Sequence, residues 1–153
     1  MSDAKSDPRD LYQQVILEHN KKPRNYGMLQ PCSHHAHGLN PLCGDDIEVT
    51  LNIEDGCVAD IKFQGSGCAI SKASSSLMTV NVKGKTVEDA ETMASQFRQM
   101  IRGELEPSSD SNILGKLSLF QGVKDLPSRV KCAVLPWATL QSAFKGEDVT
   151  STE

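Results

Sequence analysis

Apolar and polar residues alternate over positions 47–54 and again over positions 57–64, which is the spacing of two half-buried β-strands. Between the two runs, the residues Glu54-Asp55-Gly56 fit a three-residue hairpin loop. In such a loop the glycine adopts a left-handed backbone conformation that other residues rarely tolerate. The pattern therefore predicts a β-hairpin with one face turned to the core.

Apolar residues recur at helical spacing in four other segments, which are residues 11–19, 70–80, 87–101 and 130–144. Thr86 and Asp89 form a capping pair before the third segment. Pro136 lies inside the last one, where a missing amide predicts a kink or a restart of the helix. Residues 34–39 offer at most one short edge strand. The fold class expected is α+β, a small antiparallel sheet of about three strands with helices packed on one face.

The chain has 153 residues, which is the length of one ordinary domain. We expect a disordered start over residues 1–8, a single domain over residues 9–145 and a flexible polar tail over residues 146–153. No apolar run approaches the roughly 20 residues that a membrane helix needs, and the first residues lack the apolar core of a secretory signal. We therefore expect a cytoplasmic protein that does not bind membranes.

The formal net charge is -4, and lysine and arginine are scattered along the chain. No cationic surface is indicated, so nucleic acid is not an expected partner. Five cysteines occur in a chain without an export signal. An odd count in that context favours metal binding or thiol chemistry over a disulfide framework.

The hairpin loop also predicts which residues meet at the open end of the hairpin. If Ile53 faces Cys57, the same register brings Asp45 opposite Gly65 and draws Cys43 close to Cys68. Cys68 then begins a helix, where the helix dipole favours a thiolate. A further cysteine near the start of the last helix, Cys132, could complete a set of four ligands. Three thiolates and a carboxylate suit Zn²⁺, and iron or a labile iron–sulfur cluster is the alternative.

Other cysteines and histidines have more ordinary explanations. Cys32, His34, His35 and His37 lie close together in the sequence and leave a second metal site open, although exposed histidines are the favoured interpretation. Cys57 faces the core in the register above, so we expect it to pack there.

Three cysteine motifs follow one another along the chain, and they read NPLCGDDIEV, GSGCAISKASSSLM and RVKCAVLPW. They resemble the three cysteine motifs of the U-type iron–sulfur cluster assembly proteins, and DLYQQVILEHNKKPRN is similar to the first helix of that family. The resemblance covers residues 9–145, nearly the whole chain. It implies an IscU-like fold and a metal site formed by Cys43, Asp45, Cys68 and Cys132.

Three departures separate the chain from the IscU-type scaffolds of this family. Lys131 precedes Cys132 where those scaffolds carry histidine, and the segment LPSRV stands where they have LPPVK. The interval from Cys68 to Cys132 also holds an extra segment of helical length. These features resemble the SufU branch, whose members bind zinc and relay sulfur from a SufS-like cysteine desulfurase toward the Suf scaffold complex.

The resemblance implies a zinc-dependent sulfurtransferase in which Cys43 leaves the zinc and accepts the persulfide sulfur. Asp45, Cys68 and Cys132 would keep the metal. Arg129 matches an arginine of the SufU motif and could contact the desulfurase or Asp45, with a solvated arginine as the alternative. Two other functions stay open, an iron–sulfur scaffold that binds and transfers a labile cluster and an adaptor whose zinc only supports the fold.

Overall fold

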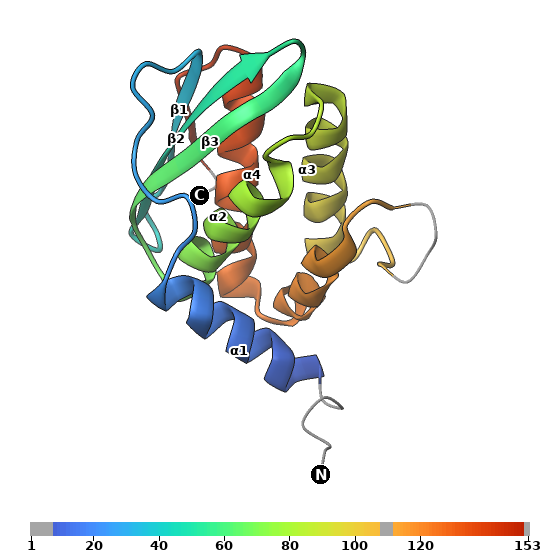
Figure 1. Ribbon diagram of the computed structural model, residues 1–153. Helices are drawn as coiled ribbons and strands as arrows, with labels where there is room; N and C mark the ends of the chain where they lie inside the picture. Colours follow the sequence, from blue (N-terminus) through green and yellow to red (C-terminus); the bar gives the residue numbers. More distant parts are fainter. Residues whose placement is uncertain (1–7, 108–111, 152–153) are drawn as a thin grey trace.

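The computed structural model describes residues 8–107 and 112–151. Its elements follow one another as α1 (Pro8–Lys21), β1 (His34–Asn40), β2 (Asp45–Glu54), β3 (Cys57–Ser66), α2 (Ala69–Val82), α3 (Val87–Ile101), the 3-10 helix η2 (Gly115–Asp125), α4 (Pro127–Phe144) and β4 (Val149–Ser151). Helices α2 and α4 lie against one face of the sheet, and α3 packs on α4 (Figure 1). The expected α+β class is confirmed. The expected disorder of residues 1–8 falls outside the described residues except at Pro8, where α1 begins.

The sheet has the strand order β3-β2-β1-β4. Neighbouring strands β1, β2 and β3 pair antiparallel, as expected, whereas β4 pairs parallel to β1. Strand β1 is therefore an internal strand rather than an edge strand. The fourth strand comes from the polar tail beyond Gly146, where His37 faces Val149, so this part of the tail is structured.

The hairpin is present, but its loop and its register differ from the expected ones. Glu54 pairs with Cys57, so the loop contains only Asp55 and Gly56, both at positive φ. An irregularity between Asn52 and Ile53 shifts the register further, as a β-bulge does. In consequence Val58 is fully buried where Cys57 was expected, and Cys57 itself is partly exposed.

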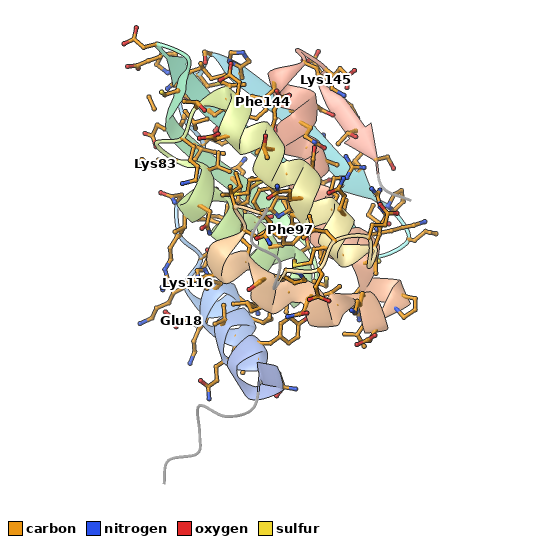
Figure 2. The ribbon with its side chains drawn as sticks, turned by 90° about the vertical axis from the view of Figure 1, so that its right-hand side faces the viewer. Glu18, Lys83, Phe97, Lys116, Phe144 and Lys145 are labelled. Atoms are coloured by element: carbon orange, nitrogen blue, oxygen red, sulfur yellow. The ribbon has the colours of Figure 1, made fainter. Side chains whose placement is uncertain are left out.

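The core lies between the sheet and the helices. Trp137 of α4 stacks on Phe97 of α3 with ring centroids 4.8 Å apart, and both side chains are fully buried (Phe97 is labelled in Figure 2). The indole Nε1 of Trp137 donates to Ser74 Oγ of α2 at 3.2 Å, and Ser74 Oγ donates to the Ala133 carbonyl at 2.7 Å. These polar contacts join α2 to α4, and both helices carry a cysteine at or near their N-terminal ends.

Helix α4 runs without a restart from Pro127 to Phe144, with Pro136 inside it. Of the two alternatives expected at Pro136, a kink or a restart, the restart is therefore wrong. The short apolar segment before α4 forms η2, whose buried residues are Leu117, Phe120 and Val123. Among the described helices, none has both the length and the apolar character needed to cross a membrane.

A buried histidine attaches α1 to α2. His19 is 9% exposed, and its Nδ1 lies 2.7 Å from Ser76 Oγ, which also accepts the Arg24 amide at 2.9 Å. Burial lowers the pKa of His19 below its ordinary value, and the nearby Arg24 charge adds to this effect. The folded protein therefore favours the neutral imidazole.

The lowered pKa of His19 predicts that acid reduces the stability of the folded protein. As the pH falls from about 7.5 to about 5.5, the unfolded chain binds a proton at this position before the folded protein does. The free energy of unfolding should therefore fall over this range. A His19→Asn variant keeps a polar group near Nδ1 and does not titrate, so urea denaturation should show a smaller loss. Equal losses in both proteins would contradict the assignment.

Candidate metal centre

Three ligand atoms from two distant segments of the chain meet near the open end of the hairpin. The Cys43 sulfur, a carboxylate oxygen of Asp45 and the Cys132 sulfur all lie within 4.8 Å of one another. Cys43 belongs to the turn between β1 and β2, Asp45 begins β2, and Cys132 belongs to α4. Within the described residues, these three are the group whose ligand atoms are close enough to hold a metal ion together.

Cys68 lies beside this group and caps α2. Its sulfur accepts the Ser71 amide at 3.4 Å, and its own amide donates to Asp45 Oδ1 at 2.9 Å. The expected place of Cys68 at a helix N-terminus is confirmed. Its sulfur interacts with that of Cys132 but lies outside the set of mutually close atoms. The structure thus gathers three of the four expected ligands and places the fourth next to them.

The carboxylate of Asp45 has one oxygen free for a ligand. Asp45 is only 2% exposed, and its Oδ2 is buried without a hydrogen-bond partner, while Oδ1 is held by the Cys68 amide. Burying an unpaired carboxylate oxygen is costly. A cation at this place would relieve that cost. Sulfur and carboxylate donors in this combination fit Zn²⁺.

The buried Cys132 thiol resists ionisation in the absence of a positive partner. Burial raises the pKa of the Cys132 thiol far above its ordinary range, and contacts with Cys43, Asp45 and Cys68 raise it further. Metal ligation requires the thiolate form, so a bound cation would reverse this balance. Arg129, in the first turn of α4, is an exposed positive charge beside the sulfurs. Its pKa is raised, first by its interaction with Cys132 and then by the charge of Cys68.

The loop that carries Cys43 is held by Asn40, a residue that the sequence analysis did not identify. Asn40 is fully buried, its carbonyl accepts the Cys43 amide at 3.2 Å, and its side-chain oxygen accepts the Leu42 amide at 3.2 Å. Gly44 has a positive φ of 75° and lets the chain enter β2. The Asn40-Pro41 pair was the available signal, since it is typical of turn initiation. Cys43 is partly exposed, whereas Cys132 is buried.

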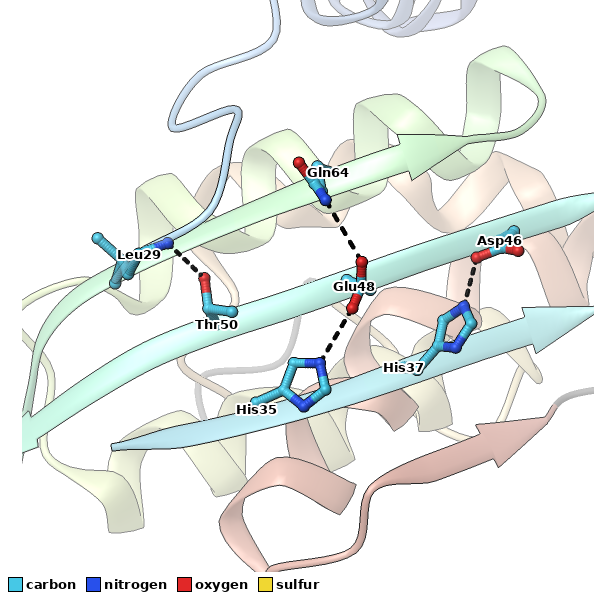
Figure 3. A network of polar contacts seen from close by, with 7 residues as sticks. All are labelled: Leu29, His35, His37, Asp46, Glu48, Thr50 and Gln64. Carbon is cyan, nitrogen blue, oxygen red and sulfur yellow. Dashed lines mark hydrogen bonds and ion pairs between the residues drawn. The ribbon is translucent and has the colours of Figure 1, made fainter. Parts of the chain in front are cut away.

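The remaining histidines and cysteines do not join this centre. His35 and His37 lie on the outer face of the sheet, where they contact Glu48 and Asp46 (Figure 3). His34 Nδ1 lies 2.8 Å from Ser33 Oγ instead. Cys32 and Cys57 are free and partly exposed, and both lie outside the three cysteine motifs.

Comparison with known proteins gives one consistent result. The family model described as the NifU-like N-terminal domain matches residues 11–133. The zinc-dependent sulfurtransferase SufU of Bacillus subtilis is 43% identical over 138 residues, which cover 90% of this chain and 92% of that protein. The iron–sulfur cluster assembly scaffold protein IscU of Streptococcus pyogenes is 39% identical over 135 residues, 88% of this chain and 83% of that protein.

Solved structures share the fold. The crystal structure of a SUF-system protein of Fervidobacterium islandicum has a TM-score of 0.80 and 35% identity, and the match covers 85% of this chain and 93% of that one. The N-terminal part of a NifU-like protein of Brucella abortus has a TM-score of 0.77 at 23% identity, covering 92% and 96%. The second match shows the fold alone.

The close approach of Gly67 to Asp45 provides a test of the metal site. A Cβ added at Gly67 would lie 2.6 Å from Asp45 Oδ1, so Gly67→Ala should displace the carboxylate. We expect the affinity for Zn²⁺, measured by competition with a chromophoric chelator, to fall at least about tenfold. Gly122→Ala is the matched control, because nothing lies within 4 Å of its added Cβ. Unchanged affinity in Gly67→Ala would remove Asp45 from the ligand set.

Proposed function

The chain belongs to the family of NifU-like N-terminal domains, and on that premise we propose that it is a zinc-dependent sulfurtransferase of iron–sulfur cluster assembly. It would accept persulfide sulfur from a cysteine desulfurase and relay it to the Suf scaffold complex in the cytoplasm. The observation that carries the proposal is the convergence of Cys43, Asp45 and Cys132, with an unpartnered Asp45 oxygen between thiols. Lys131 and the segment LPSRV support the sulfurtransferase branch over the scaffold branch.

The proposed ligands divide into holding and reacting groups. Asp45 and Cys132 are buried, at the start of β2 and within α4, and Cys68 caps α2 with its amide bonded to Asp45, so these positions suit ligands that keep a metal. Cys43 comes from a turn and is partly exposed, so a partner can reach its sulfur. Bound Zn²⁺ supplies positive charge that holds the thiols as thiolates.

The sulfur transfer itself is a thiol–disulfide type of exchange. The Cys43 thiolate attacks the outer sulfur of the desulfurase persulfide and forms a new S–S bond. The S–S bond to the desulfurase cysteine breaks, and that cysteine leaves as a thiolate. Cys43 then carries the persulfide, and Arg129 offers a positive charge beside the negative sulfurs.

Exposed apolar residues around the thiols suit a protein partner. Leu42, next to Cys43, is 77% exposed, and Leu126, just before α4, is 45% exposed. A shallow groove of about 350 Å³ begins at Leu126 and Arg129, and its other lining residues are Tyr12, Gln13, Ile16, Leu17 and Ile70. Apolar surface of this kind at a reactive group marks an interaction site. We assign the exposed apolar surface at Leu42 to the binding of the desulfurase.

A second candidate function is a scaffold that binds and transfers a labile iron–sulfur cluster. The similarity to the IscU scaffold of Streptococcus pyogenes favours it, because that protein also aligns with most of the chain. The same thiols could hold iron, and one carboxylate among them would make a cluster labile. An adaptor with a purely structural zinc is the third candidate.

The proposal predicts that Cys43 is the sulfur acceptor. Chain loaded with zinc should accelerate a cysteine desulfurase and become labelled with radioactive sulfur from cysteine, one sulfur per chain. Cys43→Ser should lose the label at least about a hundredfold, because the substitution removes the thiolate that we propose as the attacking group. Cys57→Ser is the control, since Cys57 is partly exposed but outside the centre.

Three outcomes would decide among the candidates. Labelling that survives in Cys43→Ser would contradict the relay through this residue. A visible cluster chromophore after anaerobic purification, with no stimulation of the desulfurase, would favour the scaffold. Bound zinc without stimulation would leave the structural adaptor.

The exposed Leu42 side chain predicts a docking defect that is separable from metal binding. Leu42→Glu places a charge at the rim of the thiol site, so stimulation of the desulfurase should fall about tenfold or more. The zinc content should stay unchanged because Leu42 supplies no ligand. Val80→Glu is the matched control, since Val80 is 47% exposed near the far end of α2. Equal effects of the two substitutions on the stimulation would contradict docking at Leu42.

A further inference from the structure

The outer face of the sheet carries a second group of side chains of metal-ligating types, two histidines and two carboxylates (Figure 3). His35 Nε2 lies 3.1 Å from Glu48 Oε2, and His37 Nε2 contacts Asp46 Oδ1. The two imidazoles come from β1 and the two carboxylates from β2. No residue of the thiol site takes part in these contacts.

Strand geometry explains why these four side chains share one face. His35 and His37 are two residues apart on a strand, so both rings project to the same side. His37 lies directly opposite Glu48 in the register, and Asp46 and Glu48 are again two residues apart. His35 and Asp46 lie diagonally on either side of this pair, at the roughly 7–8 Å spacing that long side chains still bridge. Ala36, between the histidines, is fully buried on the opposite face.

The carboxylate of Glu48 is held in place from both sides. Gln64 Nε2 of β3 donates to its Oε1 at 3.3 Å, while Oε2 faces His35. Interaction with His35 and then with Gln64 lowers the pKa of Glu48, so this group is a carboxylate at neutral pH. An amide that orients a ligating carboxylate is a usual feature around metal ions in proteins.

We propose that His35, His37, Asp46 and Glu48 form a second metal site, which binds a divalent transition-metal ion with mixed nitrogen and oxygen ligands. Imidazole and carboxylate together favour ions such as Zn²⁺, Co²⁺ and Ni²⁺ over Mg²⁺ or Ca²⁺. The ion takes the place of the two imidazole–carboxylate contacts, and the two pairs close around it. Within the described residues, the thiol site is the one place where three or more such ligand atoms already lie close enough for an ion, so the four outer side chains must move together to bind one. This site is independent of the proposed sulfur relay.

Both metal sites depend on the same strand. Asp45 points inward to the thiols, and Asp46, the next residue, points outward to His37. The outer ion would cross-link β1 to β2 directly above the turn that carries Cys43. The side chains concerned are accessible, with exposed fractions of 39% for His35, 34% for His37, 33% for Glu48 and 54% for Asp46.

Titration of the zinc-loaded full chain with Co²⁺ tests the proposal, because the thiol site is filled first. Calorimetry should show one further equivalent, without the intense absorption that cobalt–thiolate bonds produce. His35→Gln and His37→Gln should each weaken its binding at least about tenfold. His34→Gln is the matched control, since His34 precedes His35 but bonds Ser33 and projects to the other face.

Ring signals of the wild-type histidines give a reading that does not depend on any substitution. Paramagnetic Co²⁺ should broaden the ring signals of His35 and His37 before that of His34. The proposal is overturned if no further equivalent binds, or if His34→Gln weakens binding as much as His37→Gln. Thermal unfolding of the cobalt-free variants checks that each substitution leaves the fold intact.

Discussion

The hydrogen bond from the Cys68 amide to Asp45 Oδ1 connects the two halves of the candidate metal centre. It ties the first residue of β2 to the N-terminal end of α2, and Gly67 allows the close approach. One carboxylate oxygen is thereby fixed, and the other is left buried beside the sulfurs without a partner. A buried carboxylate in this state is costly unless a positive charge compensates it. The sulfurs of Cys43 and Cys132 lie close enough to Asp45 for one cation to contact all three side chains.

Buried serines of α2 hold the helices around the candidate metal centre in place. Ser74 joins α2 to α4 through Ala133 and Trp137, which fixes the helix that carries Cys132 relative to the helix that Cys68 caps. Ser76 joins α2 to α1 through His19. A rigid support of this kind holds ligands at constant distances. Cys43, in contrast, depends on a turn held by Asn40, and this difference in support separates the residue suited to react from those suited to hold.

Strand β2 presents different chemistry on its two faces because side chains alternate along a strand. The inner face brings Asp45 to soft sulfur ligands in a buried place. The outer face brings Asp46 and Glu48 to two imidazoles that solvent can reach. Adjacent residues of one strand thus lie in environments that differ in exposure and in the type of neighbouring side chain.

The amino-acid sequence by itself determined the hairpin, the helices α2 and α3, the cap at Cys68 and the three cysteine motifs. These features depend on local periodicity and on residues near one another in the chain. Only the tertiary structure decided the register. The two-residue turn at Asp55-Gly56 and the bulge after Asn52 differ little in local energy from the expected three-residue loop. The burial of Val58 in the core favours the register that they produce. Packing also decided two contacts between distant segments, the parallel pairing of β4 with β1 and the approach of Cys132 to Cys43. A pattern along one segment carries no information about such contacts, because their energy comes from the other segment.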